Sequence, residues 1–173
     1  MSNEKTLIAY YSRAGQNHVS GAIVDLPQGN GSILAGFAAD ITGGDLFEIE
    51  TVKKYSADYA ACVKEAVADM RSNARPQLAT QVENMDAYNT VVLVYPNWCG
   101  TMPMPVYTFL ESYDFSGKTI LPLCTHEGSG LGTTESDIAR ECPQAKVGQG
   151  LAVKGSVAAV SEPDVRTWLE GTL

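Results

Sequence analysis

A short polar segment, SRAGQN (12–17), directly follows the first apolar run of the chain. Gly15 permits backbone turns that other residues avoid, and Ser12, Gln16 and Asn17 carry side chains that donate hydrogen bonds. Successive backbone N–H groups in such a turn form a concave site for an anion, and a phosphate group suits it best. The same pattern also fits an ordinary turn between a strand and a helix.

A second segment, PNWCGTMPMP (96–105), follows the strongest apolar run and contains Trp98 outside any periodic apolar pattern. An indole at the end of a sheet offers a flat surface on which a planar heterocycle can stack. Gly100 lets backbone amides approach the edge of such a ring. The alternative is that Trp98 packs over the end of the sheet as a lid. Cys99, beside it, is either redox-active or a small apolar wall residue.

A third segment, THEGSGLG (125–132), has three glycines in eight residues, which predicts a flexible wall rich in backbone amides. It contains His126, but no carboxylate and nucleophile accompany this histidine in a catalytic pattern, and a surface imidazole bonded to a carbonyl explains it equally well. Motifs of serine hydrolases, P-loop proteins, zinc peptidases and dinucleotide-binding proteins are missing from the sequence. We therefore predict no catalytic side chain and no metal ligand.

Short apolar runs alternate with longer amphipathic ones, which predicts strands alternating with helices. The predicted strands are 6–11, 46–50, 90–95, 119–124 and 150–155, with 46–50 at an edge of the sheet. The predicted helices are 32–41, 56–73, 104–113, 133–142 and 161–171, with Ser56 and Ser161 as N-caps and Gly171 as a stop. This order predicts an α/β fold with a doubly wound, five-stranded parallel sheet and helices on both faces. Ligands of such folds bind beyond the carboxyl ends of the strands, so the three polar segments should meet there.

The composition narrows the function further. A chain of 173 residues, 45% hydrophobic and 18% charged, fits a single globular domain, 1–173. A net charge of −8 argues against nucleic acid and anionic membranes as partners. No apolar run is long enough to span a membrane and MSNEKT shows no signal-peptide pattern, so we expect a cytoplasmic protein. The cysteines, Cys62, Cys99, Cys124 and Cys142, lack metal-ligand spacing and are expected to be free, mostly buried thiols.

Together, a phosphate site, a stacking ring and an amide-rich wall describe a site for a mononucleotide with a flat aromatic head, and FMN fits best. YSRAGQN (11–17) and YPNWCGTMPMPVYTFLESYDFSGKTILPLCTHEGSG (95–130) resemble the flavodoxin-like family, and more closely its small bacterial members. The resemblance covers nearly the whole chain and implies the strand order 2-1-3-4-5, with FMN where strands one and three adjoin. The candidate FMN-binding residues are Ser12, Arg13, Ala14, Gly15, Gln16, Asn17, Pro96, Asn97, Trp98, Cys99, Gly100, Thr101, Met102, Thr125, His126, Gly128 and Ser129.

The sequence departs from the family pattern in two places. Ala14 stands where the usual flavodoxin loop has a second hydroxyl, which removes one phosphate donor. Residues 18–31 intervene before the first helix, and we expect this insertion to form a small hairpin. The N-terminal amides of that helix still contribute to phosphate binding if Asn30, Gly31 and Ser32 return beneath the phosphate. Arg13 either contacts the anion or points outward into solvent.

These features predict a low-potential electron carrier, because an acidic protein disfavours additional negative charge on the flavin. Such a carrier would dock with redox partner proteins, or with small electron acceptors, through acidic residues near the flavin. The alternative is an FMN-dependent NAD(P)H:quinone or FMN reductase, although no nicotinamide-site motif is visible. A third interpretation is a flavin- or phosphate-sensing interaction module. The oligomeric state stays open.

Overall fold

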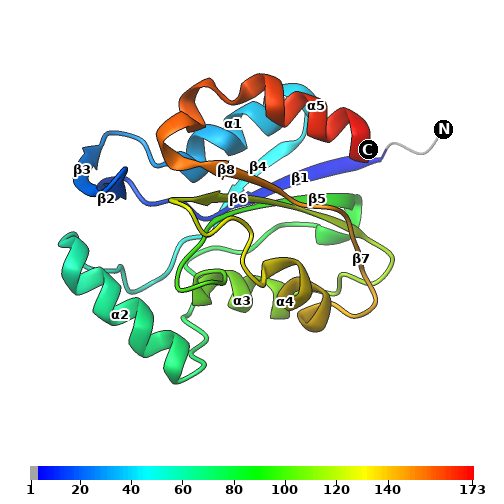
Figure 1. Ribbon diagram of the computed structural model, residues 1–173. Helices are drawn as coiled ribbons and strands as arrows, with labels where there is room; N and C mark the ends of the chain where they lie inside the picture. The colour runs from blue at the N-terminus through cyan, green and yellow to red at the C-terminus, as the bar shows by residue number, and fades with distance from the viewer. Residues whose placement is uncertain (1–3) are drawn as a thin grey trace.

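A parallel β-sheet forms the centre of the computed structural model, which describes residues 4–173 (Figure 1). The strands follow the order β4-β1-β5-β6, and β7 and β8 both pair with β6 on its far side. Every pairing in this sheet is parallel. The strands are β1 (Lys5–Tyr10), β4 (Asp45–Glu48), β5 (Tyr88–Pro96), β6 (Thr119–His126), β7 (Lys146–Val147) and β8 (Leu151–Lys154). The predicted doubly wound fold is confirmed, as is the edge position of β4.

Two layers of helices cover the sheet (Figure 1). On one face lie α1 (Asn30–Thr42) and α5 (Glu162–Thr172), and on the other lie α3 (Met104–Glu111) and α4 (Thr134–Glu141). Each layer packs against its own cluster of buried apolar side chains. By contrast, α2 (Tyr59–Arg71) projects from the sheet and buries Cys62 alone. The 3-10 helices are η1 (Met85–Ala87) and η2 (Gly155–Val160).

Among residues 4–173, no helix combines the length and the apolar character needed to cross a membrane.

The register of the sheet brings the ends of three strands to one edge. Residues 91–95 of β5 are completely buried, as expected for a strand covered on both faces. Tyr10 at the end of β1 pairs with Val94 of β5, and Pro96 at the end of β5 pairs with Thr125 of β6. The three polar segments therefore leave the sheet side by side.

The last strand differs from the predicted strand 150–155. The structure has two short strands, β7 and β8, because residues 148–150 leave the sheet between them. Three residues there oppose only two residues of β6, 121–122, which makes a bulge. One of these two is Pro122, which has no N–H to donate to a ladder.

An antiparallel hairpin separates β1 from α1. Its strands are β2 (Gly15–Val19) and β3 (Ala22–Leu26), and the connecting turn is Ser20–Gly21. Ser20 and Gly21 have φ values of 50° and 89°, and positive φ at both central residues is typical of a type I′ turn. The expected hairpin is present but starts earlier than residue 18, so part of the segment 12–17 is a strand and not a loop.

Two predicted helix boundaries are wrong. Asp58, not Ser56, caps α2, since the Asp58 carboxylate accepts a hydrogen bond from the Ala61 N–H at 2.9 Å. Ser56 instead accepts the Asp58 N–H at 3.2 Å within the preceding turn. Helix α5 continues through Gly171 to Thr172, so this glycine is not a stop.

Candidate functional site

A cavity of about 180 Å³ lies at the carboxyl edge of the sheet, between the hairpin, α2 and the segments that follow β5 and β6. Seven of the predicted residues line it: Asn17, Pro96, Asn97, Trp98, Thr125, His126 and Ser129. Five further lining residues are not among the predicted FMN-binding residues: His18, Asn30, Tyr59, Glu127 and Gly155. Asn30 was considered at the start of the first helix and Glu127 lies within the third polar segment, whereas no local pattern marks the other three.

The N-terminus of α1 packs directly against the end of β1. A Cβ added to Gly31 would lie 2.5 Å from the Tyr11 carbonyl oxygen, and one added to Gly29 would lie 2.6 Å from that of Arg13. This close approach lets the Ser32 N–H donate to Ser12 Oγ at 3.0 Å. The first N–H groups of a helix have no partner within the helix, and in α1 the Ser32 N–H finds its partner in the Ser12 hydroxyl at the end of β1.

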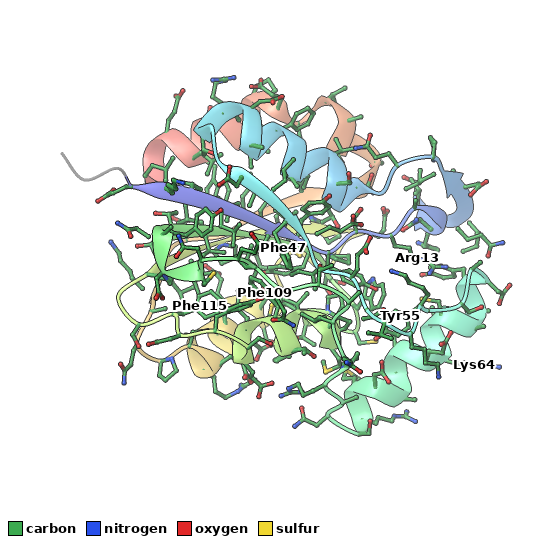
Figure 2. The ribbon with its side chains drawn as sticks, turned by 180° about the vertical axis from the view of Figure 1, so that it is seen from behind. Arg13, Phe47, Tyr55, Lys64, Phe109 and Phe115 are labelled. Carbon is green, nitrogen blue, oxygen red and sulfur yellow. The ribbon has the colours of Figure 1, made fainter. Side chains whose placement is uncertain are left out.

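Side chains of Arg13, Gln16 and Asn17 hold the first segment in place. Arg13 donates from Nε to the Gln16 carbonyl at 3.0 Å and from Nη2 to the Ala57 carbonyl at 3.1 Å. The Gln16 side-chain oxygen accepts the Tyr59 N–H at 2.7 Å, and Asn17 Nδ2 donates to the Arg13 carbonyl at 2.9 Å. Figure 2 shows Arg13 between the hairpin and α2. These bonds dock the hairpin onto the start of α2.

Residues 12–14 border a second hollow of about 190 Å³, on the β4 side of the segment, and not the first cavity. Its other walls include Glu48, Glu50 and Lys54. Burial raises the pKa of Glu48, and the nearby Glu50 carboxylate raises it further. Arg13 and Lys54 oppose the charge of the two acids, so the lining of this hollow is mixed in charge.

A tight turn presents Trp98 to the cavity. Trp98 and Thr101 exchange backbone hydrogen bonds at 2.8 and 3.2 Å, with Cys99 and Gly100 between them at φ values of 57° and 84°. The indole meets the rings of Tyr11 and Tyr55 edge-on, with centroids 5.3 and 5.4 Å apart. Two edge contacts fix the plane of the indole beside the cavity.

The four cysteines are free thiols, as expected. Cys62, Cys124 and Cys142 are buried, and Cys99 is exposed on the turn.

Ten of the predicted residues do not line the cavity: Ser12, Arg13, Ala14, Gly15, Gln16, Cys99, Gly100, Thr101, Met102 and Gly128. Met102 is completely buried in the core. The Thr101 hydroxyl donates to Asp137 Oδ2 at 2.6 Å, and this carboxylate also accepts from Thr133 at 2.7 Å and from Arg140 at 2.9 Å. Burial alone would raise the pKa of Asp137, but these hydrogen bonds outweigh burial and lower it. The network supports the turn from beneath.

The second and third segments are locked together. Asn97 Nδ2 donates to the Gly130 carbonyl at 2.9 Å, while Asn97 Oδ1 accepts the Gly100 N–H at 3.0 Å. Gly132 packs so closely that an added Cβ would lie 2.2 Å from the Gly100 carbonyl oxygen. The Gly128 N–H donates to His126 Nδ1 at 2.9 Å, so Nε2 is the ring nitrogen left to face a ligand.

The electrostatics of the cavity are set by few charges. Its described lining includes Glu127 and neither lysine nor arginine. Burial is the main cause that raises the pKa of Tyr59. The ring of Tyr59 stacks on that of His18, with centroids 6.3 Å apart and planes at 28°. The result is an aromatic, amide-lined and cation-poor cavity.

A doubly wound α/β fold with a polar cavity at the carboxyl edge of its sheet defines a class of proteins that bind ligands beyond the carboxyl ends of the strands. The sequence model of one family, described as flavodoxin, matches residues 5–172. The chain belongs to the flavodoxin family.

Solved structures agree with this assignment. A protein of Bacteroides eggerthii, described as a putative flavoprotein, is 25% identical with a TM-score of 0.79, over 98% of each chain. A similarly described protein of Bacteroides uniformis is 27% identical with a TM-score of 0.74, over 96% of this chain and 98% of that one. A flavoprotein of Lactobacillus acidophilus in complex with FMN is 20% identical with a TM-score of 0.68, over 95% and 99%. No curated protein sequence matches this chain closely enough to show a relative.

Proposed function

We propose that this protein binds FMN in the cavity at the carboxyl edge of the sheet. The group that fits a phosphate on one side is the N-terminus of α1, where Asn30 lines the cavity and Ser12, which does not line it, accepts the Ser32 N–H. The Lactobacillus acidophilus structure, which shares the fold, contains FMN. At about 180 Å³ the cavity is smaller than the roughly 300–1,000 Å³ of enclosing ligand sites. Part of the cofactor would therefore lie at the open mouth.

The opposite side of the cavity fits a planar ring. Trp98 supplies an aromatic surface held by two neighbouring rings. Asn97 and His126 lie on the segments that border it, and backbone amides of these segments can bond ring nitrogens and carbonyl oxygens. Of the predicted residues, Thr101 and Met102 would act only through the turn that carries Trp98.

We propose further that the protein is a low-potential electron carrier. FMN, when bound, supplies one- and two-electron transfer. The observation that carries this proposal is the cation-poor lining, with Glu127 as its charged residue. Without lysine or arginine in the wall, the negative charge of a reduced flavin ring is not compensated. The reduction potential of the flavin is lowered as a result. The net charge of −8 favours docking with a partner that carries a basic surface.

Anaerobic mixing with NADH and NADPH tests this function. The purified protein, loaded with FMN, is expected to keep its flavin absorption with either nucleotide and to lose it with dithionite. A spectroelectrochemical titration should give potentials below those of free FMN. Rapid bleaching by either nucleotide would refute the carrier and support the FMN-dependent NAD(P)H:quinone or FMN reductase. A protein that takes up no FMN in a titration would refute both.

A further inference from the structure

Glu127 occupies an unusual place in the cavity wall. It comes from the segment after β6, yet its Oε2 accepts the N–H of Ser20, at the tip of the hairpin, at 3.1 Å. Its Oε1 lies against the start of η2, since a Cβ added to Gly155 would be 2.4 Å from this oxygen. The same Cβ would be 2.7 Å from Asn30 Nδ2, on the first residue of α1. Four separate elements therefore meet at one carboxylate.

This position places a negative charge at the positive end of a helix dipole. The N-terminus of α1 carries a partial positive charge that attracts anions, and Glu127 lies beside its first residue. The cavity that contains Asn30 also contains Glu127, and neither lysine nor arginine lies in its described lining to neutralise it. A phosphate bound there must share the helix terminus with this carboxylate.

We propose that Glu127 is a specificity-determining residue that weakens the cavity's preference for a phosphate-bearing flavin over the same flavin without phosphate. The proposal rests on the proposed binding of FMN at the α1 N-terminus. Two like charges in one cavity repel each other, whereas the uncharged ribityl chain of riboflavin meets no such repulsion. Because Glu127 is exposed at the cavity mouth, water and salt screen the effect and keep it moderate.

The hydrogen bond to Ser20 keeps this charge in place. This bond joins residues that are 107 positions apart and attaches the tip of the hairpin to the segment after β6. The bonds of Arg13 and Gln16 attach the base of the hairpin to the start of α2. Replacement by glutamine removes the charge but keeps an oxygen that can accept the Ser20 N–H. Replacement by alanine removes both, so the two variants separate charge from tether.

The test compares Kd values for FMN and riboflavin, obtained by fluorescence titration, in wild type, Glu127→Gln and Asp40→Asn. Asp40 is exposed near the other end of α1, roughly 15 Å along the helix, so its variant removes one charge far from the cavity. In about 10 mM salt, Glu127→Gln should bind FMN roughly three- to tenfold more tightly than wild type does. Its affinity for riboflavin should differ from that of wild type by less than about twofold. In about 1 M salt the gain in FMN affinity should disappear. Asp40→Asn should leave the affinities for both flavins unchanged.

If Glu127→Gln leaves the FMN-to-riboflavin affinity ratio unchanged, the inference about Glu127 is refuted. The proposed function is not affected by that outcome. Weaker binding of both flavins by this variant would also overturn the inference, because the carboxylate would then be bonding the ligands. Wild type that binds neither flavin would instead refute the proposed function.

A second measurement needs no flavin. Hydrogen exchange of the Ser20 amide should be faster in Glu127→Ala than in wild type, and as slow in Glu127→Gln as in wild type. An unchanged exchange rate in Glu127→Ala would show that the carboxylate is not held at the hairpin, and would also overturn the inference.

Discussion

Replacement of Gly31 by alanine tests whether the close approach of α1 to β1 builds the anion site. The new Cβ would lie 2.5 Å from the Tyr11 carbonyl oxygen and 3.3 Å from Ser12 Cβ. Since ordinary carbon–oxygen contacts are about 3.4 Å or longer, the first turn of α1 must move by about 1 Å. That movement strains the hydrogen bond from the Ser32 N–H to Ser12 Oγ. Overpacking of this kind costs roughly 1–3 kcal/mol, and better helix propensity returns up to about 1 kcal/mol.

The matched control is Gly36→Ala, the same substitution in the middle of the same helix. No heavy atom lies within 4 Å of a Cβ at Gly36, so this variant should gain about 0.5–1 kcal/mol of stability. Urea denaturation should show Gly31→Ala less stable than wild type by about 1–2 kcal/mol. A fluorescence titration should show its FMN affinity reduced about tenfold, the loss of roughly one charge-assisted hydrogen bond. Equal stability and equal FMN affinity in the two variants would refute this account of the site.

Further predictions concern the cavity turn and the network beneath it. Trp98→Ala should weaken FMN binding by roughly 1–3 kcal/mol and leave flavin fluorescence less quenched, and Trp98→Phe should be intermediate. If neither FMN affinity nor quenching changes, the indole only covers the end of the sheet and does not stack on the flavin. Asp137→Asn should lower the unfolding free energy at pH 7 by roughly 1–3 kcal/mol, because a carboxylate that accepts from Thr101, Thr133 and Arg140 loses its charge. Since hydrogen bonding lowers the folded pKa of Asp137, its stabilisation is complete above about pH 4 and is lost as the pH falls through the folded value. Urea midpoints should therefore differ most between wild type and variant at pH 7 and converge only as the pH falls below the folded pKa of Asp137, and a constant difference would contradict this reasoning.

The position of the ligand cavity could be predicted from strand ends alone. Each polar segment follows an apolar run, and parallel strands end at one edge, so the segments were expected at that edge; the family resemblance implied the strand order, and the structure pairs β5 with β6. The structure places Trp98, Asn97 and His126 in one cavity for this reason. Their contacts with FMN remain a prediction.

The roles of individual donors could not be predicted in the same way. Gln16 was expected to face a phosphate, yet its side-chain oxygen accepts the Tyr59 N–H, 43 residues away. Asp58 displaced Ser56 as the N-cap because the carboxylate reaches the Ala61 N–H. Both hydrogen bonds depend on which donor lies close to the side chain in the folded protein. The local sequence does not specify these distances.

By itself, the sequence determined the layered α/β fold, the order of its elements and the edge at which a ligand can bind, because apolar runs must be buried and parallel strands share a polarity. Only the tertiary structure decided that Glu127, Asn30 and Gly155 line one cavity and that Glu127 accepts the Ser20 N–H. Residues 20 and 30 lie far from 127 and 155 in the chain, and their meeting depends on packing distances that no local pattern encodes.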